Sequence, residues 1–162
     1  MSRVWKPSVT VAAVVERDGR FLLVEERTED GLRINQPAGH LEPGETLQQA
    51  VMRETLEETA HPFTPTALLG IYLWRRPGPA DATTYLRFAF TGELQERIAG
   101  RPLDRVIVQA VWLSRQELAQ RSGEWRSPLV ARCIDDYLSG QRYPLDVLYT
   151  HPAAFAPATG YA

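Results

Sequence analysis

Apolar runs and turn signals near the start of the chain predict the beginning of a β-sheet. Val9–Glu16 is rich in β-branched and apolar residues and leads into Asp18-Gly19, a dipeptide typical of tight hairpin turns. Phe21–Val24 supplies the return strand. Thr28–Gly31 is a polar loop, and Leu32–Gln36 has the pattern of a further short strand.

A helix is predicted from Thr46 to about Ala60. Pro43-Gly44 is a turn signal, and Thr46 and Gln49 have the spacing of a capping box at a helix start. The helix is expected to end before His61-Pro62, because proline disfavours the helical conformation of the residue before it.

The rest of the chain continues with strands and ends with helices. Strands are predicted over Leu68–Trp74, Tyr85–Phe90 and Val106–Leu113. Ser114 and Glu117 form a second capping-box pattern. Ser127-Pro128 is predicted to be the N-cap and first-turn proline of a last helix that ends near Gly140.

This order of elements predicts an α/β protein with a mixed sheet rather than a regular doubly wound one. A chain of 162 residues suits one domain with one sizeable core, which we place at residues 1–150. Residues 151–162 are rich in alanine and proline, and we expect them to form a flexible tail.

Three carboxylates share one face of the predicted helix. Glu54, Glu57 and Glu58 lie at i, i+3 and i+4. The same face carries Leu47, Ala50 and Val51 one and two turns earlier. A solvated face is the alternative, but such a helix usually places its charges opposite its apolar stripe. Crowded carboxylates favour a bound hard divalent cation such as Mg²⁺, which bridges carboxylates to substrate phosphates.

Composition narrows the possible partners. The net charge of −2 provides no general attraction for nucleic acid or an anionic membrane, so we expect neither as a partner. Cys133 is the only cysteine, which excludes an internal disulfide and fits a reducing compartment. The first residues lack the order of a secretory signal, and we expect a cytoplasmic protein.

The stretch PAGHLEPGETLQQAVMRETLEET, residues 37–59, has a specific spacing of fixed residues. In order they are Gly39, Glu45 after five residues, Arg53-Glu54 after seven, and Glu57-Glu58 after two. This spacing resembles the Nudix box, the signature of hydrolases that act on nucleoside diphosphates linked to another moiety. The chain departs from the family pattern at Ala60 and His61, where a glycine and an aliphatic residue are usual. Thr55 also replaces an aliphatic residue.

The resemblance implies a Nudix α/β/α sandwich with a mixed β-sheet, in which the box forms loop–helix–loop. It implies a catalytic set of Arg53, Glu54, Glu57 and Glu58, with the Ala38 carbonyl joining the three glutamates as metal ligands. Glu54 either ligates metal or serves as the base that deprotonates water. Gly39, Glu45 and the Glu45–Arg53 salt bridge are assigned to the structure of the loop. The implied metal is Mg²⁺, with Mn²⁺ as a substitute, and a later acidic ligand comes from Asp104, Glu93 or Glu96.

Further segments resemble the NudJ-type phosphatases of this family, in the same order. They are KPSVTVAAVV, NQPAGHLE, LRFAF, RSPLV and SGQRYPL. The resemblance implies removal of phosphate from nucleoside tri- and diphosphates, or from hydroxymethylpyrimidine and thiamine diphosphates. It also implies a small phosphorylated partner, and we expect a monomer or a homodimer.

Candidate substrate contacts follow from this resemblance. Trp5 and Trp74 could stack on a base, although core or edge packing is the favoured interpretation for both. Arg87 lies among apolar residues and either reaches a phosphate or pairs with a buried carboxylate. Gln36 either contacts the substrate or makes a structural hydrogen bond.

Two other functions stay open at this stage. An ADP-ribose or nucleotide-sugar pyrophosphatase is one, since Pro77 falls 16 positions after His61. A non-catalytic Nudix-like domain that senses nucleotides is the other, although such domains tend to lose the glutamates retained here. An RNA 5′-end hydrolase is disfavoured because the chain has no excess of basic residues.

Overall fold

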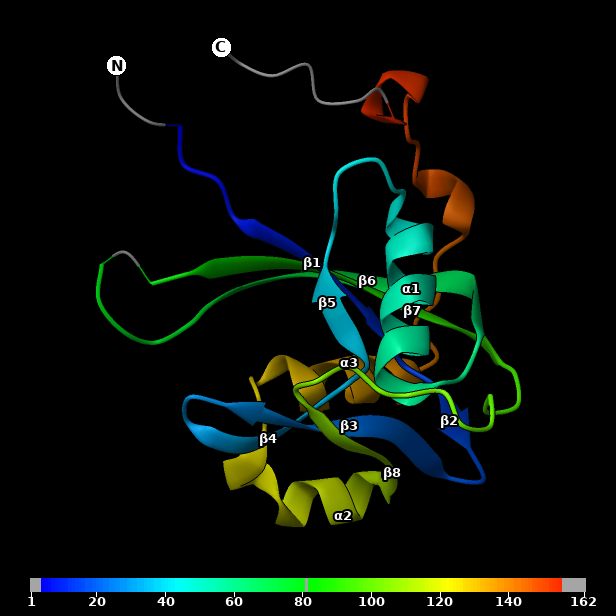
Figure 1. Ribbon diagram of the computed structural model, residues 1–162. Coiled ribbons are helices and arrows are strands. Elements are labelled where there is room, and N and C mark those ends of the chain that lie inside the picture. The colour runs from blue at the N-terminus through cyan, green and yellow to red at the C-terminus, as the bar shows by residue number, and fades with distance from the viewer. Residues whose placement is uncertain (1–3, 81, 156–162) are drawn as a thin grey trace.

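The computed structural model describes residues 4–80 and 82–155, and their strands form two four-stranded sheets (Figure 1). The first sheet has the order β5 (Ala38–His40), β1 (Ser8–Ala13), β7 (Thr84–Leu94), β6 (Phe63–Arg75). Within it β1 and β7 are parallel, and the other pairs are antiparallel. In the second sheet, β3 (Arg20–Thr28) pairs antiparallel with β2 (Glu16–Arg17), β4 (Gly31–Asn35) and β8 (Ile107–Ser114).

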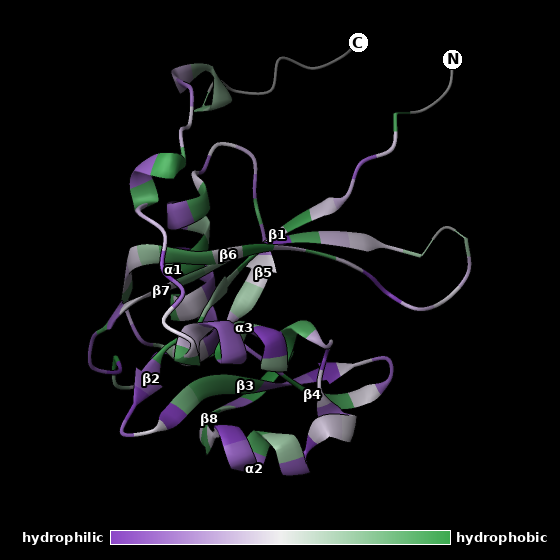
Figure 2. Cartoon of the chain, turned by 180° about the vertical axis from the view of Figure 1, so that it is seen from behind, coloured by the Kyte–Doolittle hydropathy of each residue, from purple (hydrophilic) through white to green (hydrophobic). Residues whose placement is uncertain are grey.

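The helices are arranged in layers around these sheets. They are α1 (Leu47–Thr59), α2 (Arg115–Gln120) and α3 (Leu129–Leu138), with 3-10 turns at Ser122–Glu124, Leu145–Val147 and Pro152–Phe155. Figure 1 shows α1 over one face of the first sheet and α2 beyond the second. Figure 2 shows the hydrophobic length of β3 between α2 and α3. The expected α/β sandwich with a mixed sheet is therefore confirmed, and the second, antiparallel sheet adds to it.

The first apolar run of the sequence is explained by burial on both faces of β1. Val11 and Ala13 face a core shared with α1, whereas Ala12 and Val14 face a core shared with α3 and β3. Successive side chains of a strand point to opposite faces, so a strand with two covered faces has no polar alternation.

The box helix has the predicted boundaries. The Thr46 hydroxyl accepts the Gln49 N–H, and the Gln49 side chain accepts the Thr46 N–H, so the capping box is formed. The helix ends at Ala60, which takes the left-handed conformation with φ 61°. Left-handed geometry favours glycine, which explains why the family pattern has glycine at this position. His61 is buried, and its Nδ1 lies 2.8 Å from the Gln95 carbonyl oxygen.

Some boundaries differ from the predictions. The sequence patterns assign no strand to Ala38-Gly39, yet these residues belong to the edge strand β5, because pairing with β1 imposes the extended conformation. Thr28 and Gly31 lie in the paired ends of β3 and β4, not in a loop. Pro128, rather than Ser127, takes the N-cap position of α3, although the Ser127 hydroxyl still accepts the Leu129 N–H at 3.2 Å.

The end of the chain is described only in part. Pro152–Phe155 forms a 3-10 turn, and residues 156–162 lie outside the described residues, so a flexible tail over 151–162 stays a prediction. In the part of the chain that the structure describes, the helices lack the length and apolar character that a bilayer crossing requires.

Candidate active site

The loop between β5 and α1 is fixed by one arginine. The Arg53 guanidinium donates to both carboxylate oxygens of Glu45, at 3.0 and 2.7 Å, and to the His40 carbonyl oxygen at 3.0 Å. Glu45 also accepts the Glu42 N–H at 2.7 Å. Burial raises the pKa of Glu45, but the hydrogen bonds from Arg53 outweigh it and hold that pKa below its usual value. The expected Glu45–Arg53 salt bridge is therefore present.

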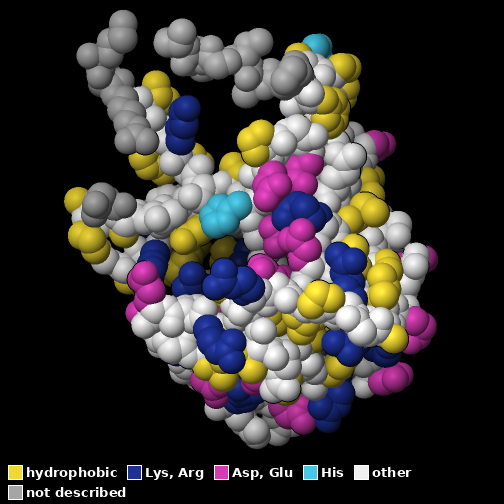
Figure 3. All heavy atoms as spheres, viewed as in Figure 1, with side chains coloured by type: hydrophobic (Ala, Val, Ile, Leu, Met, Phe, Trp, Pro, Cys, Tyr) yellow, Lys and Arg dark blue, Asp and Glu magenta, His cyan; other side chains and the backbone are white. Residues whose placement is uncertain are grey.

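The three box glutamates differ in their surroundings. Glu58 and Glu54 are buried, with 5% and 9% of their surface exposed. The Glu57 side chain is 41% exposed. Arg53 contacts Glu54 at 2.8 Å and Glu57 at 3.3 Å. Figure 3 shows acidic side chains gathered with basic ones over α1, next to a hollow in the surface.

Strand β5 approaches the glutamates through its backbone. The Ala38 N–H donates to Glu58 Oε2 at 2.9 Å. A methyl group added at Gly39 would overlap the carboxyl group of Glu54, so only glycine allows this approach. Hydrogen bonds to β1 lie at Pro37 and Leu41, so alternation along the strand turns the carbonyl groups of Ala38 and His40 away from β1. Arg53 of α1 donates a hydrogen bond to the His40 carbonyl oxygen, so these carbonyl groups face α1.

Crowding and burial disturb the titration of these carboxyl groups. Burial raises the pKa of Glu58 to about 9, opposed by the Ala38 hydrogen bond and reinforced by the charges of Glu54, Glu26 and Asp104. Burial also raises the pKa of Glu54 against the favourable effect of Arg53. Both groups are hard to ionise without additional positive charge nearby.

Among the later acidic residues, Asp104 lies beside the box helix. Its N–H donates to the Glu57 carbonyl oxygen at 2.9 Å, and its charge raises the pKa values of Glu54 and Glu58. Glu93 instead pairs with Thr64 in the β6–β7 ladder. Of the three acidic candidates, Asp104 is the one that the structure brings to the glutamates.

These residues fit a hard divalent cation chemically. Carboxylate and carbonyl oxygens are the donors that Mg²⁺ prefers, and a cation would relieve the repulsion that raises the pKa of Glu58. Across residues 4–80 and 82–155, no group of three or more Asp, Glu, His or Cys side chains is already gathered closely enough to enclose a metal ion. Arg53 lies between Glu54 and Glu57 and pairs with both.

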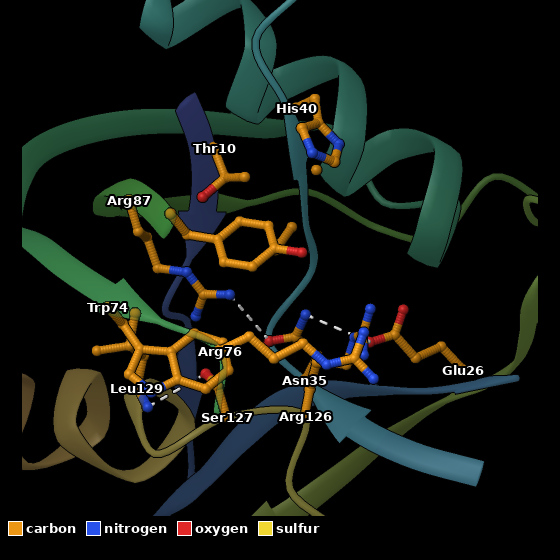
Figure 4. A pocket seen from close by; sticks show the side chains of 13 residues that line it. Thr10, Glu26, Asn35, His40, Trp74, Arg76, Arg87, Arg126, Ser127 and Leu129 are labelled. Atoms are coloured by element: carbon orange, nitrogen blue, oxygen red, sulfur yellow. Dashed lines mark hydrogen bonds and ion pairs between the residues drawn. The ribbon is translucent and has the colours of Figure 1, made fainter. Parts of the chain in front are cut away.

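A cavity of about 190 Å³ adjoins β5. Its lining residues come from both sheets and from the segment before α3: Thr10, Glu26, Asn35, Ala38, Gly39, His40, Trp74, Arg76, Tyr85, Arg87, Arg126, Ser127 and Leu129. Figure 4 shows their side chains converging from β1, β7, β5 and the β3–β4 pair. Because Ala38 and Gly39 both line the cavity and contact the glutamates, the two features form one continuous site.

The predicted substrate residues divide into two groups. Trp74 and Arg87 line the cavity, and the Trp74 ring stacks on Tyr85 with centroids 5.9 Å apart. Gln36 is buried outside the cavity lining, where its amide donates to the Val130 carbonyl oxygen and accepts from Arg87. Trp5 is 67% exposed and lines a separate depression that also includes Arg75. The assignment of these residues to substrate stays a prediction.

Arg87 is a buried cation held by neutral groups. It is 7% exposed and donates to Gln36 Oε1 at 3.1 Å and Asn35 Oδ1 at 3.3 Å. In the described residues, no carboxylate lies within 4 Å of its guanidinium nitrogens. The buried-carboxylate alternative is therefore not what the structure shows, and the amides leave the positive charge uncompensated at close range.

Sequence reasoning missed several cavity residues. Glu26 is a partly enclosed carboxylate whose pKa is raised by burial, and Arg126 lies 3.3 Å from it. Thr10 and Asn35 also line the cavity. A signal was present for Arg126, Thr10 and Asn35, because each lies in a segment that resembles NudJ-type phosphatases. Glu26 gave no such signal, since adjacent charged residues at a strand end are usually solvated.

Comparison with known proteins identifies the family of this chain. The NUDIX domain model matches residues 5–133. The chain is 45% identical to Phosphatase NudJ of Escherichia coli (strain K12) over 145 residues, which covers 90% of this chain and 92% of that protein. It is similar to a NUDIX hydrolase structure from Nitrosomonas europaea, with 50% identity, a TM-score of 0.86, and coverage of 90% of this chain and 98% of that one.

A more distant neighbour supports the fold alone. The structure of a UDP-X diphosphatase has a TM-score of 0.69 at 20% identity, covering 88% of this chain and 68% of that one. With the family model matching most of the chain, and with the box glutamates, the Arg53 brace and the adjoining cavity in one place, the chain belongs to the Nudix hydrolase family.

Proposed function

We propose that this hydrolase removes phosphate, with Mg²⁺, from nucleoside tri- and diphosphates or from hydroxymethylpyrimidine and thiamine diphosphates. The observation that carries the proposal is the pair of buried carboxyl groups, Glu54 and Glu58, held against the backbone of β5. They adjoin a cavity that contains both arginine and aromatic side chains.

The chain's own residues provide the site for this chemistry. Glu54, Glu57, Glu58 and the Ala38 carbonyl would hold the cation, and Asp104 is the nearest further acidic group. A bound Mg²⁺ would neutralise phosphate charge and make water nucleophilic enough to attack phosphorus at neutral pH. Arg53 keeps the loop and two of the glutamates in fixed positions.

The cavity would receive the rest of the substrate. Its lining includes Arg76, Arg87 and Arg126, which supply the local positive charge that an anionic substrate needs in a chain of net charge −2. Arg76 and Arg126 are paired with Asp30 and Glu26, whereas Arg87 donates to two amide oxygens and lies beside the Cys133 thiol. We place the phosphate at the β5 edge, beside the cation, and the ring in the cavity, where the stacked side chains of Trp74 and Tyr85 lie.

The name of the relative in Escherichia coli supports a phosphatase over an enzyme that cleaves an internal pyrophosphate. A small phosphorylated molecule is the proposed partner, without nucleic acid or membrane. A cytoplasmic location, and a monomeric or homodimeric state, remain predictions.

Product analysis tests this proposal. Nucleoside di- and triphosphates, hydroxymethylpyrimidine diphosphate, thiamine diphosphate and ADP-ribose are each incubated with the protein and MgCl₂, and orthophosphate is assayed with and without an added phosphatase. We expect direct orthophosphate release from the nucleotides or the pyrimidine diphosphates. Orthophosphate that appears from ADP-ribose only after phosphatase treatment would mean an internal cut and would replace the proposal.

A further inference from the structure

Thr10 presents a buried hydroxyl group that the fold itself does not use. The residue is 7% exposed, and its Oγ1 has no hydrogen-bond partner among the residues that the structure describes. Buried threonine hydroxyls usually donate to a nearby acceptor, as those of Thr55 and Thr59 do here. Because Thr10 also lines the cavity, a molecule bound there is the remaining source of a partner for this enclosed hydroxyl.

Thr10 and Arg87 point to the same place. They are directly paired in the parallel β1–β7 ladder, and Thr10 is paired with His40 across the β1–β5 ladder. Residues opposite each other in neighbouring strands project from the same face of a sheet. Figure 4 shows Thr10 and Arg87 on adjacent strands of the cavity wall.

The remaining donors of Arg87 complement the Thr10 hydroxyl. A guanidinium has five N–H groups, and the two hydrogen bonds to Gln36 and Asn35 leave others unassigned. A guanidinium offers no acceptor, so the group that satisfies both residues must itself accept hydrogen bonds. Trp74 and Tyr85, stacked at an interplanar angle of 19°, provide a flat apolar surface in the same cavity.

The size of the cavity limits what can enter. Ligand pockets commonly enclose about 300–1,000 Å³, so a cavity of about 190 Å³ encloses one end of a substrate rather than a whole nucleotide. The catalytic glutamates lie at β5, which accounts for the phosphate end. The enclosed end is then the ring.

We propose that Thr10 and Arg87 form the specificity-determining contact of this enzyme. They hydrogen-bond an acceptor atom, a carbonyl oxygen or a ring nitrogen, on the edge of a flat heterocycle that lies against the Trp74–Tyr85 stack. The inference rests on the proposed function and names the class of substrate: a phosphorylated molecule whose heterocycle has an acceptor edge.

Binding in the absence of metal tests this contact separately from catalysis. Dissociation constants are measured by calorimetry in EDTA for UMP, phenyl phosphate and ribose 5-phosphate, which carry respectively an acceptor-edged ring, a ring without acceptors, and no aromatic ring. Loss of one hydrogen bond in Thr10→Val should weaken UMP binding by about 3- to 10-fold and leave the other two ligands nearly unchanged. Thr91→Val is the matched control, since Thr91 is a buried threonine of the same sheet outside the cavity.

Equal weakening of all three ligands, or unchanged UMP binding, would overturn the proposal, as would wild-type protein that binds UMP no better than ribose 5-phosphate. If Thr10→Val does not fold, Thr10→Ser and Thr10→Ala replace it, and only the serine variant should keep UMP affinity. Failure of the proposed function would have a different result: the wild-type protein would release no phosphate but would still bind UMP more tightly than the other two ligands.

Discussion

Glu58 is the residue at which burial and charge conflict most strongly. Its carboxyl group accepts the Ala38 N–H, yet its pKa stands at about 9 because burial and the charges of Glu54, Glu26 and Asp104 oppose ionisation. An ordinary helical glutamate is solvated and has a pKa of about 4.3. Perturbed carboxyl groups of this kind are typical of functional sites, and here a cation would offset the conflict.

The substitution Glu57→Gln tests whether the Glu57 carboxylate is needed for turnover rather than for folding. The Glu57 side chain is 41% exposed, so the substitution should leave folding intact. Turnover with MgCl₂ should fall by at least about 100-fold. Substitution of residues that only hydrogen-bond to a metal ligand already costs up to about 100-fold in activity, and loss of a ligand should cost more. Glu42→Gln is the control, because the Glu42 side chain is 64% exposed and its contact with Arg53 is long, at 3.9 Å. Wild-type rates in Glu57→Gln would refute the assignment of this helix to metal binding.

Gly39→Ala tests the close approach of β5 to the glutamates. The added methyl group would overlap the end of the flexible Glu54 side chain rather than backbone, so we expect Glu54 to be displaced at small cost in stability. Phosphate release should fall severely while the melting temperature changes little. Gly123→Ala is matched, since no atom lies within 4 Å of its added methyl group. Equal activity of both variants would show that the Glu54 position is not critical.

At the scale of elements, the sequence predicts α1 well and β5 poorly. The capping box at Thr46 and Gln49 is a local signal, and the structure forms it as predicted. Strand β5 has only three residues, including Gly39, and has no local strand signal. It becomes a strand because β1 offers a paired edge, a tertiary interaction that local patterns do not contain.

The residues that line the cavity could not be grouped from local sequence patterns either. The box residues are close in sequence, so their grouping on one helix could be read from spacing. Thr10, Asn35 and Arg126 reach one cavity from distant segments. These residues come together because of the order of the strands in the sheets and the course of the segment that precedes α3. The resemblance marked their segments but could not assign their contacts.

The N-cap of α1 gives a prediction at this scale. Thr46→Ala removes the acceptor for the Gln49 N–H and should lower the free energy of unfolding by about 1 kcal/mol in urea denaturation. Thr46→Ser keeps the hydroxyl and should retain most of the stability. If the serine and alanine variants were equally destabilised, the hydroxyl would not be the stabilising group.

In the whole molecule, the packing of the two sheets and α1 brings several carboxyl groups into a partly buried region. The molecule places Glu54 and Glu58 between α1 and β5, and brings Glu26 from the second sheet and Asp104 from the loop before β8 close enough to act on Glu58. Stability should therefore depend on pH and on divalent cations together.

Melting temperature in EDTA should fall as the pH rises from 5 to 9. The Glu58 carboxyl has a pKa of about 9 in the fold and about 4.5 when unfolded, so the folded chain binds the extra proton in this window. The stability from this group is complete below pH 4.5 and is lost as the pH approaches 9. Glu58→Gln should flatten the fall, and MgCl₂ should raise the melting temperature most at high pH. Identical pH profiles for wild type and Glu58→Gln would contradict this.

The most direct test of the central claim is the rate of orthophosphate release from a nucleoside diphosphate by the wild-type protein, measured in MgCl₂ and in EDTA. We predict release that rises with Mg²⁺ to saturation, recovers with Mn²⁺ and is absent in EDTA, because in this proposal Glu54 and Glu58 hold the cation and do not catalyse the reaction alone. Release at the same rate in EDTA would contradict the account.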